Sequence, residues 1–267
     1  MKHYRIAFLA LVAALAAGPL AAPLSAAPIH EMHMGHLGAL YERETLQEEF
    51  SQVYNLAAGG TVDLKNTNGS VTLTGWDQPR VQLTAIKKGH SKPDLDAVTL
   101  DIRSDQGRLT VRTVYPQGHR DGVSVSYTLS VPRHVNLELD TVNGSVKISG
   151  VSGAINTATK NGSISVLNSS GAATATTING SITIELDQVT MNNDMKFTTT
   201  NGSIKVHLPA NINADVQAST TNGGIRTDFP LTVEGKYNSK SMNGRLGGGG
   251  RVLTLKTVNG SVNLSKK

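Results

Sequence analysis

The sequence predicts an all-β protein built as a parallel β-solenoid, with about 16–22 residues per coil and a less regular N-terminal half. The first observation is that the dipeptide Asn-Gly recurs, and its last seven copies are 18, 18, 22, 21, 21 and 16 residues apart. A period near twenty residues is typical of a small unit stacked on itself. The copies begin at Asn68, Asn143, Asn161, Asn179, Asn201, Asn222, Asn243 and Asn259.

The second observation is an alternation of apolar and polar residues on both sides of each Asn-Gly. The residue three positions after the Asn is always apolar, and the residue four positions after it is polar or Gly. Such alternation marks a half-buried strand. The apolar positions are Val71, Val146, Ile164, Ile182, Ile204, Ile225, Leu246 and Val262. Each repeat therefore reads as strand, Asn-Gly corner, strand.

A single Asn-Gly between two strands is also a β-hairpin signal, so a meander or sandwich of hairpins is the alternative fold. The repetition favours stacking, because each Asn amide can then bond the Asn amides above and below it. We expect all eight Asn residues to form a structural corner ladder. We also expect Ile182→Asp to unfold the domain, because it places a charge inside a ladder of apolar side chains.

Residues 1–27 read as a secretory signal peptide. A basic start precedes an unbroken apolar run, and small residues follow, with cleavage expected between Ala22 and Ala27. The chain contains no Cys, so neither a lipid anchor nor disulfide bonds are expected. No second apolar run is long enough to cross a membrane, and the mature chain is expected to be exported without a transmembrane segment.

The remaining chain divides into a leader and a repeat domain. Residues 28–49 are expected to be a flexible leader that contains His and Met and ends in a short helix over Leu40–Glu49, which covers the open end of the solenoid. Residues 50–267 are expected to form the repeat domain, less regular over 50–135 and regular over 136–267. A separate β-sandwich over 55–135 is the alternative.

The charge pattern argues against a nucleic-acid surface. The formal net charge is +5, and it falls to +3 once Lys2 and Arg5 are removed with the signal peptide. A nucleic-acid surface needs a basic stripe and usually stacking aromatics. The basic residues are dispersed along the sequence and only 4% of the residues are aromatic.

Three short stretches carry a family resemblance. They are Gly75-Trp76-Asp77 after the first Asn-Gly-Ser-Val, Val81-Gln82-Leu83-Thr84-Ala85, and Leu129-Ser130-Val131-Pro132 before the dense repeats. Together with the repeats, they resemble the bacterial putative-adhesin family of β-strand-repeat proteins over roughly residues 50–267. The resemblance implies an exported β-solenoid on or near the cell envelope, and it implies no defined chemistry or cofactor.

Two sets of residues were considered for chemistry. His30, His33 and His36, with two Met between them, could bind Cu or Ni, but nothing completes the site, so no metal is expected. A polysaccharide-active enzyme would need two carboxylates near one bond. The candidates are the pairs Glu138 with Asp140 and Glu185 with Asp187, which lie in different columns of the repeat and are not expected to converge.

The function expected from the sequence is that of an exported, non-enzymatic, adhesin-like binding scaffold of the cell envelope. Its partner would be a glycan, peptidoglycan or protein surface, and the protein itself would be a monomer. One alternative is a scaffold that senses envelope stress or antimicrobial peptides. The other is a polysaccharide-active β-helix enzyme.

Overall fold

The chain is described from a computed structural model that covers residues 45–105, 107–116, 122–189, 193–233 and 239–267. The chain divides into two units, Met1–Glu42 and Arg43–Lys267, and all described residues lie in the second. The expected signal peptide, residues 1–27, and the leader as far as residue 44 lie outside the described residues.

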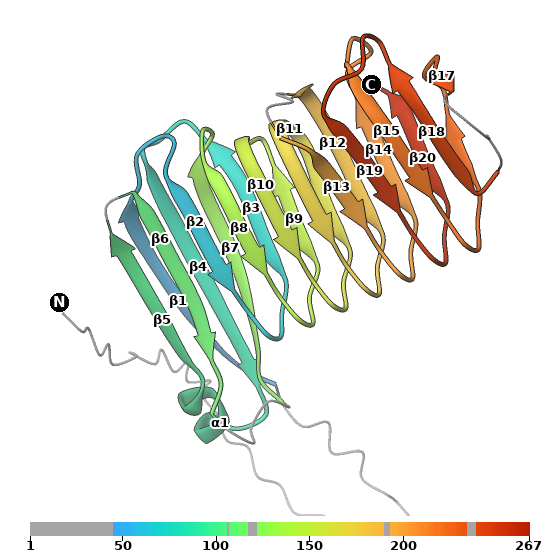
Figure 1. Ribbon diagram of the computed structural model, residues 1–267. Coiled ribbons are helices and arrows are strands. Elements are labelled where there is room, and N and C mark those ends of the chain that lie inside the picture. Colours follow the sequence, from blue (N-terminus) through green and yellow to red (C-terminus); the bar gives the residue numbers. More distant parts are fainter. Residues whose placement is uncertain (1–44, 106, 117–121, 190–192, 234–238) are drawn as a thin grey trace, which may run out of the picture. The chain divides into compact units, whose positions relative to one another are not determined.

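The described unit is all-β, with strands arranged in two rows that lie back to back (Figure 1). The first row includes the strands that precede the Asn-Gly corners. In spatial order it contains β5 (Thr99–Asp105), β6 (Arg108–Val114), β2 (Thr61–Lys65), β8 (Asn136–Asp140), β10 (Ser152–Ala158), the second part of β11 (Ile164–Thr176), β13 (Met195–Thr198), β19 (Val252–Lys256), β15 (Ala214–Ser219), β18 (Ser241–Leu246) and β17 (Thr232–Val233).

The second row includes the strands that follow the corners. It contains β1 (Leu46–Asn55), β4 (Arg80–Gly89), β7 (Ser124–Pro132), β3 (Val71–Trp76), β9 (Val146–Ser149), the first part of β11, β12 (Ile182–Val189), β14 (Ile204–Leu208), β20 (Val262–Lys266) and β16 (Ile225–Thr227). Strand β11 therefore belongs to both rows. It turns between them at Asn168, whose φ of 47° lies in the left-handed region.

The pairing is of mixed orientation. Strands in the middle of both rows pair in parallel, as in β8 with β10 and β9 with β11. Antiparallel pairs stand at the N-terminal end of both rows (β1–β4, β4–β7 and β5–β6) and at the C-terminal end of the first row (β15–β18 and β17–β18). The expectation of parallel pairing throughout is therefore corrected at the ends.

One first-row strand, its corner and the following second-row strand make a level, and the levels do not follow chain order. The spatial order of the corners is Asn68, Asn143, Asn161, Asn179, Asn201, Asn259 and Asn222. The last coil of the chain consists of β19 and β20. In space it lies between the level of Asn201 and the level of Asn222, although both of these precede it in the sequence. This coil has Leu253, Leu255 and Leu264 at its inward positions, and both of its strands have a neighbour on each side.

The core is a single layer of side chains between the two rows. Ile182, for example, is fully buried and pairs with Ile164 on one side and Ile204 on the other. Outward neighbours such as Lys147 and Lys205 are exposed. The inward-outward alternation of the sequence is therefore the alternation of the structure.

The N-terminal end of the unit differs from the sequence expectation. Leu46–Glu49, where the capping helix was expected to end, belong to strand β1, which pairs with β4. The described residues hold one helix, α1 (Lys92–Ala97), and Ser91 caps it by accepting a hydrogen bond from the Asp94 N–H. The buried Lys87 of β4 donates to the carbonyl of Leu95, and burial lowers its pKa although Glu48 lies nearby.

Candidate binding surface

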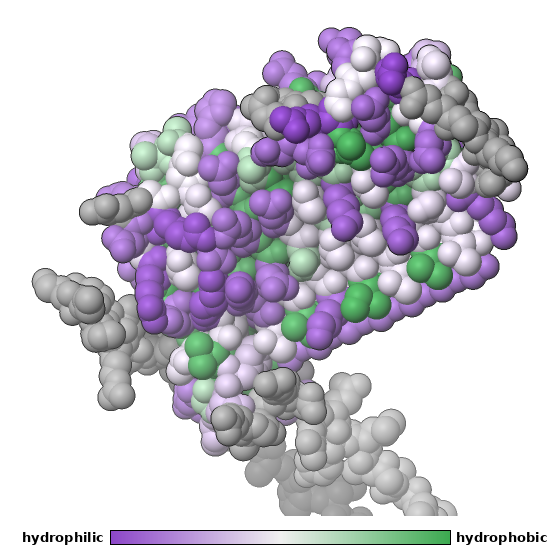
Figure 2. Space-filling model, viewed as in Figure 1, coloured by the Kyte–Doolittle hydropathy of each residue, from purple (hydrophilic) through white to green (hydrophobic). Residues whose placement is uncertain are grey.

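The corners form one continuous row of asparagine side chains along the edge where the two strand rows meet. Each Asn donates from Nδ2 to Oδ1 of the Asn on the next level, and the six distances are 2.7–2.8 Å. The donors in chain order are Asn143, Asn161, Asn179, Asn201, Asn222 and Asn259, and Asn68 accepts at the end of the row. Figure 2 shows this edge as a narrow hydrophilic band.

Asn243 does not join the row, which corrects the expectation that all eight Asn residues would do so. It lies inside strand β18 and pairs with Gln217 of β15. The segment after it reads Gly247-Gly248-Gly249-Gly250 and carries no apolar side chain that could face the core. Strand β18, which carries Asn243, pairs antiparallel with β15 on one side and with β17 on the other, at the C-terminal end of the first row.

Glycine is needed at the corners because neighbouring levels approach each other closely. A Cβ built on Gly180 would lie 2.1 Å from the carbonyl oxygen of Gly162, and one on Gly202 would lie 2.0 Å from that of Gly180. Both distances are far inside van der Waals contact. The close approach lets each corner N–H bond the level beside it, as Gly180 N does with Asn201 O at 2.9 Å.

Two further columns support the corners. The Thr two residues before the Asn is buried and donates its hydroxyl to the Gly carbonyl of the neighbouring level at 2.8–3.0 Å, as Thr177 does to Gly162. The Ser two residues after the Asn accepts a hydrogen bond from the Ser N–H of the next level, as Ser163 does from Ser181. The Thr column therefore fixes the corner from inside, and the Ser column lies along its outer side.

The bonding leaves hydrogen-bond donors pointing outward. Among the described residues, the second Nδ2–H of Asn143, Asn161 and Asn179 and the hydroxyl hydrogen of Ser163 and Ser181 have no protein partner. The Oδ1 atoms of Asn143, Asn161 and Asn179 and the Oγ atoms of Ser163 and Ser181 each accept one bond within the protein. The edge can therefore offer repeated N–H and O–H donors to a ligand that supplies acceptors.

The first level departs from this pattern. Asn66 replaces the Thr, is buried, and donates from Nδ2 to the carbonyls of Asn68, Gly69 and Val125 at 2.8–3.2 Å. Its Oδ1 accepts from Thr113, whose hydroxyl also lies 2.7 Å from the Tyr127 hydroxyl, and burial raises the pKa of Tyr127. Since Asn66 occupies the Gly69 carbonyl, the buried Thr141 Oγ1 on the next level has no partner among the described residues.

Charged residues gather on the outer face of the first row, over β6, β2 and β8, where Figure 2 shows a hydrophilic patch. Arg112 Nη2 lies 2.5 Å and Arg108 Nη2 lies 3.3 Å from Asp63 Oδ2, and Arg108 also bonds Glu138. Burial alone would raise the pKa of Asp63, but the two Arg side chains outweigh it and hold this pKa below its ordinary value. The sequence does not identify Asp63 as the partner of these two Arg side chains, because it lies 45 and 49 residues away from them in the chain.

The carboxylate pairs considered for catalysis do not meet. Glu138 and Asp140 lie on β8 in the first row, beside β2 and β10. Glu185 and Asp187 lie on β12, which pairs with β14 in the second row, and Lys267 forms ion pairs with both of them, at 2.6 Å to Glu185. A two-carboxylate site needs both groups around one bond, and these pairs belong to different strand rows.

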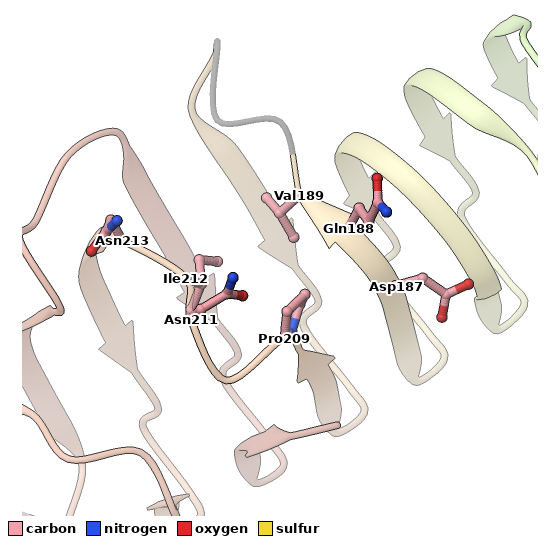
Figure 3. A pocket seen from close by; sticks show the side chains of 7 residues that line it. All are labelled: Asp187, Gln188, Val189, Pro209, Asn211, Ile212 and Asn213. Atoms are coloured by element: carbon pink, nitrogen blue, oxygen red, sulfur yellow. The ribbon is translucent and has the colours of Figure 1, made fainter.

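A hollow of about 540 Å³ lies between the end of β12 and the connection from β14 to β15 (Figure 3). Its described lining comprises Asp187, Gln188, Val189, Pro209, Asn211, Ile212 and Asn213. Asp187 is the one carboxylate of that lining, and Lys267 already pairs with it. The Asn213 Oδ1 accepts from Gly248 N. The polar side chains of this hollow that have a defined partner, Asp187 and Asn213, are therefore engaged in contacts within the protein.

Three further features bear on the candidate chemistry. His30, His33 and His36 lie outside the described residues. Within the described ranges, no group of three or more His, Cys, Asp or Glu side chains could hold a metal ion. In the same ranges, no helix is both long and apolar enough to cross a membrane.

Comparison with known proteins gives one family match and several similar structures. The family model described as Toastrack DUF4097 matches residues 49–265. A cell adhesion protein described as putative, from Clostridium sporogenes ATCC 15579, is 12% identical, with a TM-score of 0.43 over 82% of this chain and 100% of its own. A putative adhesin from Bacteroides fragilis NCTC 9343 is 9% identical, with a TM-score of 0.42 over 82% of this chain and 97% of its own. No protein of curated function matches the sequence.

Proposed function

The chain belongs to the Toastrack DUF4097 family, and we propose that it is an exported, non-enzymatic scaffold that binds a repetitive polymer of the cell envelope. In this proposal, the stacked levels act as a parallel β-solenoid that displays the same polar groups at a fixed spacing. The polymer is a glycan or peptidoglycan, and the protein acts as a monomer. Export rests on the signal-peptide pattern of residues 1–27.

The observation that carries the proposal is the repetition of outward donors along the corner edge. Seven Asn side chains stand in one row, on levels about 4.8 Å apart, the usual spacing between strands. A globular ligand would meet only a few of them. A linear polymer with a regular chemical repeat can meet many at once, and several weak contacts then add to a useful affinity.

The position of the Asn row supports an interaction role in addition to a structural one. Six of the seven Asn residues, from Asn143 to Asn259, are exposed, so the ladder is open to solvent along its length. If the repeats had only a structural role, the buried apolar columns and the Thr column would be enough to hold the levels together. The exposed Asn and Ser columns provide a polar surface of one chemical kind that extends over consecutive levels.

A sedimentation assay tests the proposal. The purified protein is incubated with insoluble peptidoglycan and with immobilised outer-membrane polysaccharide, and the pelleted fraction and the polymer length are measured. Retention on one of these polymers without shortening is the expected result. Shortening of the polymer would favour an enzyme, and it would direct attention to Glu138, Asp140, Glu185 and Asp187. Absence of retention on every envelope polymer would overturn the binding role.

A further inference from the structure

We propose that the corner edge binds an anionic polysaccharide whose carboxylates are separated by uncharged sugar units. This inference rests on the proposed polymer-binding function and narrows it to one edge of the protein and one ligand class. The edge is defined here as the corner strip, which runs on each level from two residues before the row Asn to four residues after it. Its seven segments are 66–72, 141–147, 159–165, 177–183, 199–205, 220–226 and 257–263.

The corner strip has an uneven charge. It contains no Asp and no Glu, but it contains four basic residues, Lys147, Lys160, Lys205 and Arg226. All four are exposed, and none forms an ion pair with a described residue. Elsewhere in the described residues many cations are paired, as Arg108 and Arg112 are with Asp63. Because these four cations are unpaired and the strip contains no carboxylate, the strip favours a negatively charged ligand.

The neutral groups of the corner strip favour the same ligand. Asn161 Oδ1 and Ser163 Oγ each accept one bond inside the protein, whereas the second Nδ2–H of Asn161 and the hydroxyl hydrogen of Ser163 have no partner among the described residues. Donors bind carboxylate and hydroxyl oxygens, and a bond to an ionised carboxylate is stronger than a bond to a neutral acceptor. The strip thus combines cations with neutral donors, and a charged sugar chain offers matching acceptors of both kinds.

The density of charge separates a polysaccharide from a nucleic acid. Seven levels span about 29 Å at the usual strand spacing, and they carry only four cations. A nucleic-acid strand carries one negative charge about every 3.4 Å and is usually held by stacking aromatics when single-stranded. The corner strip contains no Phe, Tyr or Trp. It therefore fits a chain whose charges are widely spaced.

Apolar side chains beside the Asn row can contact the uncharged units. On three levels the residue just before the Asn is aliphatic, namely Val142, Ile178 and Val258, and Ile178 is 44% exposed. These aliphatic groups alternate with Lys160 and Thr200 in the spatial order of the levels. Small apolar contacts between polar ones suit the C–H face of a sugar ring, which carries hydroxyls at its rim.

The test compares two soluble polymers with the same linear glucan backbone. Carboxymethylcellulose carries carboxylates, and hydroxyethylcellulose does not. Binding of the purified protein is measured by isothermal titration calorimetry at low salt. Binding to carboxymethylcellulose is expected, with loss near 0.5 M NaCl because exposed charges are then screened, and no binding to hydroxyethylcellulose is expected.

Matched variants locate the binding edge. The variant K147Q/K160Q/K205Q removes three exposed cations from the corner strip. The variant K65Q/K196Q/K256Q removes three exposed cations from the outer face of the first row, with the same change in net charge. The first is expected to weaken binding about tenfold, and the second less than about threefold, since each exposed charge contact contributes little alone. Circular dichroism melting curves check that both variants fold.

The outcomes separate this inference from the broader proposal. Equal losses in the two variants, equal binding of the uncharged polymer, or tighter binding of polyphosphate or single-stranded DNA would overturn the inference. In the first two cases, a polymer-binding function would still stand. Retention on envelope polymers with no binding to carboxymethylcellulose would overturn this inference alone. Absence of binding to all of these polymers would overturn both.

Discussion

Asn259 donates from its side-chain Nδ2 to Asn201 Oδ1 at 2.7 Å, although the two residues are 58 positions apart in the chain. Asn222, which lies between them in sequence, is found on the far side of Asn259 in space. The last coil of the chain is therefore inserted into the stack, and the Asn row is continuous in space where it is discontinuous in sequence. The stability of the corner edge and the binding that we propose for it both involve this row.

The Asn row is expected to stabilise the fold. Asn161→Ala removes the bond that Asn161 gives to Asn143 and the bond that it accepts from Asn179, and should lower the free energy of unfolding by about 1–2 kcal/mol. Urea denaturation measures the change. Asn243→Ala is the matched control, because Asn243 lies exposed in β18 outside the row, and its effect should stay within about 0.5 kcal/mol. Similar losses in the two variants would contradict the ladder.

Close approach between levels makes the corner Gly sensitive to a single methyl group. Gly180→Ala should destabilise the protein by about 2–3 kcal/mol, because the new Cβ would lie 2.1 Å from the Gly162 carbonyl oxygen. Gly224→Ala, on the last level of the row, should be nearly neutral, since no heavy atom lies within 4 Å of the added Cβ. Thermal melts of the two variants give the comparison, and a neutral Gly180→Ala would refute the stated reason for the glycine.

The apolar ladder should not tolerate a charge. Ile182→Asp places a carboxylate between the buried side chains of Ile164 and Ile204 on the two neighbouring levels, and it should abolish the cooperative melting transition. Its neighbour Thr183 faces outward, so Thr183→Asp should melt close to the wild type. Melting curves of the two variants, followed by far-ultraviolet circular dichroism, test this prediction. A wild-type melting curve for Ile182→Asp would show that the inward column has been assigned to the wrong residues.

The stability provided by Asp63 should depend on pH. Burial opposes its ionisation, but Arg112 and Arg108 hold its pKa in the folded protein below the ordinary value. A lowered folded pKa stabilises the fold above the pKa of the unfolded chain, and this contribution disappears as the pH falls through the folded pKa. The difference in unfolding free energy between wild type and Asp63→Asn should therefore be large at pH 7 and small near pH 3.

Urea titrations at these two pH values test the Asp63 prediction. Glu49→Gln is the control, because Glu49 is exposed on β1 and forms no ion pair with a described residue. Its effect should be small at both pH values. A difference between wild type and Asp63→Asn that grows toward pH 3 would contradict the sign of the shift.

The sequence predicted the local pattern of the fold well for a physical reason. A strand with one buried face must alternate, and like residues on stacked levels produce repeating columns, so the inward place of Ile182 could be read directly. The exception at Asn243 was not predicted: Gly248 stands five positions after that Asn, but the Asn222 level, with the polar Thr227 at the same position, does join the row. The expected helix over Leu40–Glu49 gave way to strand β1 at Leu46, because β4 offers a ten-residue pairing edge that the local sequence does not reveal.

Long-range choices could not be predicted from one sequence. Any regular coil can stack on any other, so the motif around Asn259 did not reveal that its level lies next to that of Asn201. The partner of Arg112 could not be found either, since Asp63 is 49 residues away and meets it only through the pairing of β2 with β6. Among the antiparallel pairs at the ends of the rows, β1–β4, β4–β7 and β15–β18 depend on similar long-range pairings, whereas β5–β6 is a local hairpin.

The claim that the corner row is a binding edge can be tested most directly by nuclear magnetic resonance of the Asn side-chain amides. Carboxymethylcellulose is added to the isotope-labelled protein, and the amide signals are assigned by single Asn replacements. We predict that the signals of Asn143, Asn161, Asn179 and Asn201 shift together, while those of Asn213 and Asn243 stay unchanged. Shifts confined to Asn213 or Asn243, with an unchanged corner row, would contradict the account.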